Sequence, residues 1–431
     1  MTDTTAGPAT PAGPRFAVAG DRVFDARAGG WAGDSVVLVD GGLIAGLRPS
    51  APDGWAVLEV PGASLLPGLI DAHTHVLLRS SYDELELARQ MVEENLGHRA
   101  ASAVQAMSIS VRHGFTTIRD LGSEGAGYLD VGLRDAAREG LVPGPRMLVA
   151  GPAIRSTGRY PVPGQRHGLT FPVGIDSCTG ATACRETVRT QIACGIDCLK
   201  IYVNERFDGP DGPDGYPEGP LVWTEDELAA LVDEAHRQGL RVAAHSMTLS
   251  GARLAVTAGV DSIEHGFAIS PDLAADMASR GTALVPTLLV TREHAAHGTA
   301  ISAALRAAHN RSFVNCLEAG VPIVFGTDVG GFEWTRVRQA EEFALMTALG
   351  MAPADAVQAG TVRAAELLGL AGTAGVLEAG AVADIVAVTG DPLQDIECLQ
   401  QVQLVIQGGQ VAWDGHHLTR TGLDPASRSA S

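Results

Sequence analysis

The sequence predicts a closed (β/α)8 barrel, TIM-like in class, with a small β-sandwich domain built from both ends of the chain. Three observations carry this prediction. Eight short apolar runs alternate with amphipathic helical segments across residues 67–372. The flanking stretches, 16–66 and 373–418, instead show short strand-like runs separated by Gly, Asp and Pro turns. A chain of 431 residues with 45% hydrophobic residues suits one large domain plus a smaller partner.

The two flanking stretches are expected to form one sheet domain because their patterns are alike. Near the N-terminus, "VDGGLIAG" (39–46) predicts a hairpin that turns at its glycine pair. Near the C-terminus, "ADIVAVTGDP" (383–392) and "VQLVIQGGQVAWDG" (402–415) repeat the pattern of short strands and glycine turns. Residues 1–15 are expected to be a disordered tail, and residues 419–431 a C-terminal tail.

Each expected barrel strand is a short apolar run, and a helical segment follows most of them. The clearest helix covers residues 224–239, where Thr224 is the expected N-cap, Glu227 completes a capping box and Gly239 ends the helix. The segments 250–259 and 270–281 follow the same rules. The eight runs are "LIDAHTHVLL" (69–78), "FTTIRDLG" (115–122), "RMLVAGPAI" (146–154), "CLKIYV" (198–203), "RVAAHSM" (241–247), "DSIEHG" (261–266), "ALVPTLLV" (283–290) and "PIVFGTDVG" (322–330).

Two long insertions rich in Gly and Pro follow the third and fourth runs. They cover residues 155–174 and 204–223. Loops that follow barrel strands lie on the face where active sites form, and loops of this length in a compact domain are usually lids, binding loops or disordered segments.

Charge and composition exclude several classes of partner. The formal net charge of −19 argues against nucleic-acid binding, which needs a positive surface, and against adsorption to anionic membranes. The N-terminus lacks the basic start and apolar core of a secretory signal, and no apolar stretch is long enough for a transmembrane helix. The cytoplasm is the expected compartment. Six cysteines are too sparse for a disulfide framework, so buried or structural thiols are expected.

The first apolar run places two histidines one residue apart. Side chains at positions i and i+2 of a strand point to the same face, so His73 and His75 lie side by side. Two imidazoles on one face can share a metal ion, but they can also be two satisfied core histidines. The pair alone does not decide between these interpretations.

Four further polar residues stand at or near the ends of other runs. Each alone has a structural explanation: a satisfied core histidine, a salt-bridged or surface lysine, or an aspartate that caps the next helix. Because the carboxyl ends of barrel strands converge, core packing does not account for six such residues at matching positions. The predicted site consists of His73, His75, Lys200, His245, His265 and Asp328.

The residue types at this site indicate a pair of divalent cations. Imidazole and carboxylate suit zinc, the first expectation, although affinity order alone does not choose between zinc and its neighbours. A protonated amine cannot bind a cation, so Lys200 fits only if carbon dioxide converts it to a carbamate that bridges two metals. Two ions about 3.5–4 Å apart hold a bridging hydroxide and polarise a carbonyl oxygen. Asp328 would take the proton of that hydroxide and later protonate the leaving group.

These motifs resemble the amidohydrolase superfamily, and the resemblance covers nearly the whole chain. The marks are "PGLIDAHTH" (67–75), the lysine of "CLKIY", the histidines of "AAHS" and "IEHG", "GTD" (326–328), and the late "AAELLGL" and "GVLEAGAVADIVAV" segments. The resemblance implies that His73 and His75 bind the more buried metal and that carbamylated Lys200 bridges both. It also implies that His245 and His265 bind the more exposed metal, while Asp328 ligates the buried one and acts as acid and base.

Weaker marks are similar to one branch of that superfamily. "HGFTTIRDLG", "VPGPRMLVAG", "STG" and "FGTDVG" resemble the branch with Xaa-Pro dipeptidases, N-acyl-amino-acid carboxypeptidases and ochratoxin- or phenylurea-type hydrolases, which is related to imidazolonepropionases. The "TGGHG"-like segment of that branch reads "STGRYPVPGQRHG" here, which leaves the role of His167 open. The branch implies a homo-oligomer and a small-molecule substrate.

Substrate contacts are expected from the loop after the third run and from the fourth run. A substrate carboxylate needs a positive group, and Arg155, Arg159, Arg166 and His167 are the candidates, unless these are solvated surface residues. Tyr202 lies two residues after Lys200 and so faces the same side, where it would donate a hydrogen bond to an oxyanion or simply pack in the core.

The expected function is hydrolysis of an amide C–N bond in a small molecule: a dipeptide such as Xaa-Pro, an N-acyl amino acid, or a related amide or urea. One alternative is a mononuclear deaminase that acts on a ring C–N bond. Such enzymes lack the bridging lysine and usually carry a glutamate near the fifth-strand histidine, whereas "AAHSM" has none. A second alternative is a non-catalytic scaffold, which intact metal ligands argue against.

Overall fold

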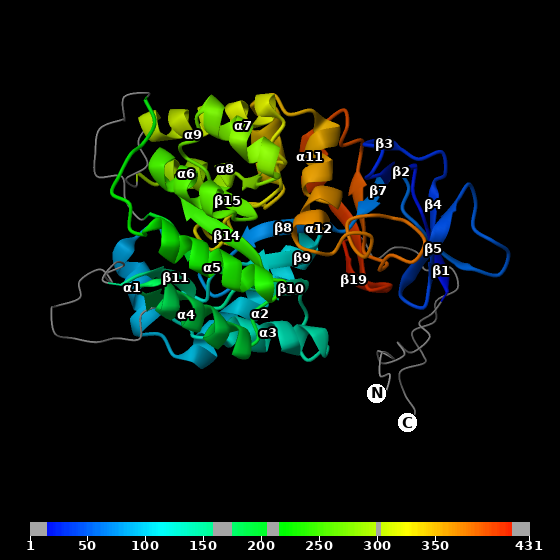
Figure 1. Ribbon diagram of the computed structural model, residues 1–431. Helices are drawn as coiled ribbons and strands as arrows, with labels where there is room; N and C mark the ends of the chain where they lie inside the picture. The colour runs from blue at the N-terminus through cyan, green and yellow to red at the C-terminus, as the bar shows by residue number, and fades with distance from the viewer. Residues whose placement is uncertain (1–14, 158–174, 205–214, 299–302, 416–431) are drawn as a thin grey trace, which may run out of the picture.

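A barrel surrounded by helices lies beside a smaller β-rich part in the computed structural model, which describes residues 15–157, 175–204, 215–298 and 303–415 (Figure 1). The predicted fold class is confirmed. The expected tails, apart from residue 15, lie outside the described residues. The exact domain boundaries stay a prediction.

The β-rich part is made of two sheets, one of N-terminal strands alone and one that combines strands from both ends of the chain (Figure 1). β7 and β17 pair antiparallel, with Leu66 opposite Val386, and this pairing joins the two ends. The predicted hairpin is also confirmed, because Gly41 and Gly42 connect β4 to β5 with positive φ angles that suit glycine. One sheet has the order β5-β4-β1-β6, with β1 Phe16–Ala19, β4 Val36–Asp40, β5 Leu43–Arg48 and β6 Ala56–Glu59; the other has the order β19-β18-β17-β7-β2-β3, with β2 Arg22–Asp25, β3 Gly30–Trp31, β7 Ala63–Pro67, β17 Ile385–Thr389, β18 Val402–Gln407 and β19 Gln410–Asp414.

The barrel strands are parallel throughout and form two sheets, β10-β9-β8 and β12-β11-β13-β14-β15-β16. The third expected run is divided in two at residues 150–152, where Gly151 has a φ of 66°. β12, which pairs with β11 at the sheet edge, lies just beyond the first predicted insertion and was not expected. The strands are β8 Leu69–Thr74, β9 Phe115–Asp120, β10 Arg146–Val149, β11 Ala153–Ser156, β12 Ile175–Cys178, β13 Cys198–Tyr202, β14 Arg241–Ser246, β15 Ser262–His265 and β16 Ala283–Val285.

The seventh and eighth runs differ from the expected strands. The seventh is a strand only to Val285, because Pro286 cannot continue the ladder and α8 begins at Leu288. The eighth, 322–330, forms isolated bridges to Leu284 and Thr74 rather than a regular strand. It still closes the ring through backbone hydrogen bonds on both sides, from Val324 to Leu284 and from Asp328 to His73.

The helices cover the barrel. Of the three with predicted signals, α5 and α7 begin at the expected N-caps, whereas α6 begins at Leu249, after the N-cap Thr248, and not at the predicted residue 250. Thr224 and Glu227 form the capping box of α5, and Gly259 and Gly281 end α6 and α7 in left-handed conformations. Among the described residues, no helix combines the length and apolar character needed to cross a membrane. The helices are α1 Glu84–Val92, α2 Leu96–Arg112, α3 Leu129–Arg138, α4 Ala181–Ala193, α5 Glu225–Arg237, α6 Leu249–Ala258, α7 Pro271–Arg280, α8 Leu288–Ala296, α9 Ala303–Ala319, α10 Glu341–Ala348, α11 Pro353–Ala359, α12 Val362–Leu367 and the 3-10 helix η1 Ile396–Gln400.

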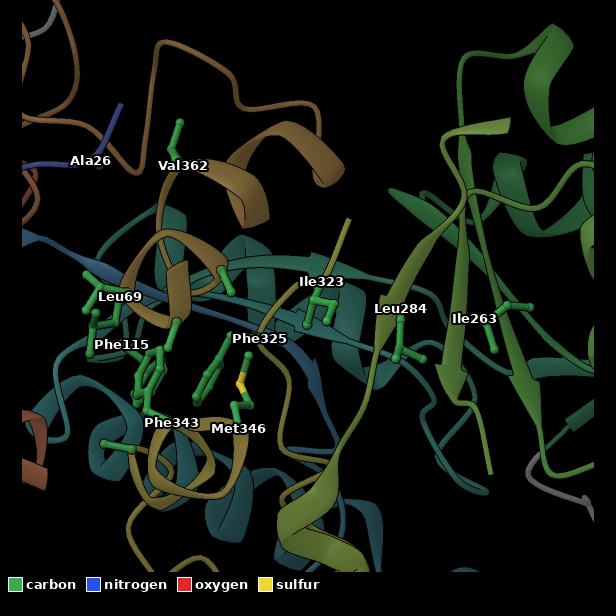
Figure 2. Close-up of a cluster of buried hydrophobic side chains, with 14 of the residues drawn as sticks. Ala26, Leu69, Phe115, Ile263, Leu284, Ile323, Phe325, Phe343, Met346 and Val362 are labelled. Carbon is green, nitrogen blue, oxygen red and sulfur yellow. The ribbon is translucent and has the colours of Figure 1, made fainter. Parts of the chain in front are cut away.

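An aromatic stack connects the irregular eighth segment to its neighbours. The Phe325 ring lies 5.3 Å from that of Phe115 and 4.1 Å from that of Phe343, measured between centroids (Figure 2). Phe115 begins β9 and Phe343 belongs to α10, so buried side chains hold this segment where ladder hydrogen bonds are sparse. The six cysteines have free thiols, as expected, and five of them are buried.

Candidate active site

The six residues predicted from the strand ends all line one cavity of about 280 Å³. Nζ of Lys200 lies 3.3 Å from Nε2 of His73. An Asp328 carboxylate oxygen lies 3.6 Å from that same His73 nitrogen and 3.2 Å from Nε2 of His75. The rings of His245 and His265 have centroids 4.6 Å apart. The fold therefore brings together residues that are separated by up to 255 positions in the sequence.

The donor atoms at this site suit a divalent cation. His73, His265 and Asp328 each offer a ligand atom, and these atoms lie within 4.8 Å of one another. Burial by itself would raise the pKa of Asp328, but the charges of His73, His75 and Lys200 outweigh it and hold that pKa well below its ordinary range. A carboxylate surrounded by imidazoles is the ligand chemistry of zinc and related ions, so the residues fit the expected metals.

Lys200 is the only lysine in the chain; the other 30 of the 31 basic residues counted as Lys or Arg are arginines. Its side chain is buried in β13, and burial lowers its pKa to about 8. Arginine provides the positive charge everywhere else, yet this position carries a primary amine. Unlike a guanidinium, an amine can be converted to a carbamate, so the residue type fits a bridging carboxylate.

Hydrogen bonds to one ring nitrogen orient three of the histidines. Nδ1 of His73 pairs with Glu264 at 2.7 Å, Nδ1 of His75 with the Gly122 carbonyl at 3.2 Å, and Nδ1 of His265 with the Thr287 hydroxyl at 2.8 Å. In His73 and His75 this leaves Nε2 directed at Asp328. Partners of this kind fix the ring tautomer and orientation of metal-binding histidines.

Glu264, the partner of His73, also forms a buried ion pair with Arg119. Arg119 of β9 donates to Glu264 at 2.8 Å, and both side chains are almost fully buried. Burial alone would raise the pKa of Glu264, but Arg119 and His73 outweigh it and lower the pKa to about 2. Glu264 is therefore an anion that holds the Nδ1 proton of His73.

Asp71 connects the first strand to the irregular eighth segment. Its carboxylate accepts from the backbone N–H groups of His73 and Thr327, from the Thr327 hydroxyl at 2.7 Å and from Gln339 at 2.8 Å. One buried side chain thus positions the backbone next to both His73 and Asp328.

Four non-glycine residues in the described part of the chain have positive φ angles, and all of them belong to this region. They are Glu124 (44°), His265 (66°), Thr287 (51°) and Asp328 (60°). Such conformations cost about 1–3 kcal/mol each and persist only where the surroundings enforce them, which is common at active sites.

The N-terminus of α8 is capped from another helix. Thr287 precedes α8, but its hydroxyl contacts His265 instead of capping the helix. Glu342 of α10 takes over this role and accepts from the N–H groups of Leu288 and Leu289 at 2.8 and 2.6 Å. Burial raises the pKa of Glu342 to about 8.

Replacing Glu342 with Gln is expected to change how stability depends on pH. The folded protein keeps the Glu342 proton up to about pH 8, whereas an unfolded glutamate releases it near about 4.3. Folding stability therefore falls as pH rises between these values, by up to about 1.4 kcal/mol per pH unit from this residue. Urea unfolding of both proteins from pH 5 to 8 measures the difference. Parallel curves for wild type and E342Q would contradict this assignment.

Only part of the predicted substrate-binding set lies among the described residues. Arg155 of β11 and Tyr202 of β13 line the cavity, and the Arg155 guanidinium lies over the Tyr202 ring at 4.2 Å. Arg159, Arg166 and His167 lie outside the described residues. The sequence interpretation missed Glu124, which follows β9 and lines the same cavity.

Comparison with known proteins decides the family. The sequence matches the amidohydrolase family over residues 64–412, which is most of the chain. The chain belongs to the amidohydrolase family. As an amidohydrolase it is a hydrolase that acts on carbon–nitrogen bonds.

Two curated relatives and one solved structure illustrate the similarity of this amidohydrolase to known members. It is 30% identical over 379 residues to an uncharacterized protein of Mycobacterium tuberculosis, covering 85% of this chain and 90% of the relative. It is 28% identical over 398 residues to ochratoxinase of Aspergillus niger, covering 85% and 78%. A crystal structure of a Xaa-Pro dipeptidase with methionine in its active site superposes with a TM-score of 0.79 at 28% identity, covering 93% and 100%.

Proposed function

We propose that this amidohydrolase cleaves the amide bond of a small molecule with a free carboxylate, with a dipeptide or an N-acyl amino acid as the substrate class. The observation that carries the proposal is the only lysine of the chain, buried among four histidines and one aspartate. Relatives named Xaa-Pro dipeptidase and ochratoxinase support hydrolysis of small amides.

In this proposal the six cavity residues hold two divalent ions, with zinc the first expectation. His73 and His75 would hold one ion, His245 and His265 would hold the other, and Lys200, as a carbamate, would contribute ligand oxygens to both. When bound, such ions activate a water molecule and polarise the scissile carbonyl. Asp328 would help to hold the first ion, and its carboxylate would accept a proton from the attacking water and deliver it to the nitrogen of the leaving group.

Arg155 and Tyr202 are proposed to orient the substrate. The guanidinium suits a carboxylate because its fork of N–H donors matches the two oxygens. Tyr202 carries a hydroxyl into the same cavity, where it can donate to a substrate oxygen.

A homo-oligomer is also proposed, and light scattering would test it. A cytoplasmic location stays a prediction from the sequence.

Metal analysis combined with a substrate panel tests the proposed function. Protein loaded with zinc or manganese should contain about two ions per chain and hydrolyse at least one of the Xaa-Pro dipeptides, other dipeptides or N-acyl amino acids. Treatment with a chelator should abolish turnover, and added metal should restore it. One ion per chain would favour the deaminase alternative, and turnover that survives complete metal removal would refute the proposal.

A further inference from the structure

Three polar side chains follow one face of α9. His309, Ser312 and Asn315 stand three residues apart, a spacing that places them on the same side of a helix. His309 and Ser312 are almost fully buried. A buried polar side chain is costly unless it is hydrogen-bonded, so the partners of these residues show what this face of α9 does.

Two of the three side chains hold the loop between β15 and α7. The Ser312 hydroxyl accepts from the Ile269 N–H at 2.9 Å and lies 3.1 Å from the Phe267 carbonyl. The Asn315 amide donates to the Ile269 carbonyl at 2.8 Å. The helix α9 thus fixes the backbone of a loop that begins directly after a proposed metal ligand.

The third side chain, His309, binds two carbonyl groups with one ring nitrogen. Its Nε2 lies 2.9 Å from the carbonyl oxygen of His265 and 2.8 Å from that of Pro286. Because carbonyl oxygens only accept, Nε2 carries a hydrogen that the two oxygens share. Burial lowers the pKa of His309 to about 4, so the ring is neutral and its Nδ1 accepts from the buried Thr291 hydroxyl at 3.0 Å.

Both carbonyl groups adjoin a residue with a left-handed backbone. One carbonyl belongs to His265, whose φ is 66°, and the other immediately precedes Thr287, whose φ is 51°. Such conformations persist in non-glycine residues only where the surroundings enforce them. The shared hydrogen of His309 provides this restraint at both positions.

Thr287 carries the restraint on to the His265 ring. Its hydroxyl pairs with Nδ1 of His265 at 2.8 Å. His309 therefore reaches His265 by two routes: directly at its carbonyl, and at its ring through Pro286 and Thr287. The His309 ring also stacks on Phe267, which lines the cavity, with the centroids 4.3 Å apart.

We infer that His309 is a positioning residue that holds His265 in the geometry needed to bind the second divalent ion. This inference rests on the metal site of the proposed function. Loss of the hydrogen bonds that orient a metal ligand typically weakens metal binding by about 10- to 100-fold. His309→Leu removes the N–H donor and should weaken the ion proposed for His245 and His265 by this factor, while the affinity for the first ion should stay close to that of wild type.

Metal titration compares wild type with H309L, H309Q and C316A. Calorimetry of metal-free protein with zinc and a competing chelator gives the two affinities without any substrate. H309Q offers an amide N–H near the position of Nε2 and should restore part of the affinity. Cys316 is buried further along α9 and packs in the apolar core, so C316A should lose stability but bind both ions as wild type does. Equal affinities in wild type and H309L, or an equal loss in C316A, would overturn the inference.

A variant of the neighbouring helix keeps the inference testable if H309L does not fold. Thr291→Val preserves the shape of that side chain in α8 but leaves Nδ1 of His309 without its donor. T291V should weaken the same ion by a smaller factor than H309L. Zinc affinities identical to those of wild type in T291V would overturn the inference.

Crystal structures of metal-free protein separate this inference from the proposed function. His265 should leave the left-handed region in H309L and keep it in wild type, and an unchanged His265 backbone and ring would overturn the role of His309. Wild type that binds two ions but hydrolyses no amide would refute the proposed substrate class. A selective loss of the second ion in H309L would still support the role of His309.

Discussion

Lys200→Ala should lower kcat/KM by roughly 10³-fold or more and reduce bound metal from about two ions per chain. Metal ions at such sites supply several kcal/mol of transition-state stabilisation, and each 1.36 kcal/mol corresponds to a factor of ten. Without the proposed bridge, the ligands of the two ions are no longer connected. Lys200→Arg is the matched control, because it retains a positive charge but has no amine that can become a carbamate, and it should be equally inactive.

The sequence allows a direct test of the carbamate. Because Lys200 is the only lysine, protein equilibrated with ¹³C-labelled carbon dioxide should show one side-chain carbamate signal, and K200A should lack it. The N-terminal amine is the other primary amine, and its signal should be the same in both proteins. Short carboxylic acids should partly restore K200A by replacing the missing oxygens. Wild-type activity and metal content in K200A would contradict the bridging role.

The barrel was predictable because its signals are local and repeated. Apolar runs and capping residues such as Thr224 and Glu227 mark each unit, and the convergence of parallel strand ends places distant residues together without knowledge of their contacts. The irregular eighth segment was not predictable in the same way. Its apolar pattern is that of a strand, but Asp71 takes the Thr327 N–H that a ladder would use.

The cost of burying a charged side chain, an argument used above only for Lys200, also indicates the residues that support the site. A buried lysine in an apolar run was recognised as costly, and the same reasoning applies to Arg119, Glu264 and Asp71, which also lie in apolar runs. Their pairings could not be read from the chain, since Arg119 and Glu264 are 145 positions apart. The positive φ angles at Thr287 and Glu124 have no sequence signal, because neither residue type favours that conformation.

Asp328→Asn should lower kcat by roughly 10²- to 10⁴-fold, the range typical of a lost general acid or base. The φ of 60° at Asp328 makes asparagine the appropriate replacement, because asparagine tolerates the left-handed conformation at least as well as aspartate does. D328N should therefore unfold near the wild-type temperature. D328A should unfold lower by the cost of placing alanine in that conformation, so it mixes a folding defect with a catalytic one.

The leaving group distinguishes proton delivery from a general loss of metal binding. If Asp328 protonates the departing nitrogen, a substrate with a weakly basic leaving group, such as a nitroanilide, needs that proton less. D328N should then lose less activity on the nitroanilide than on the matching dipeptide, while its metal content stays near two ions per chain. The same loss on both substrates, together with depleted metal, would make Asp328 a ligand alone. Because Asp328 lies within reach of both His73 and His75, only this comparison separates its two proposed roles.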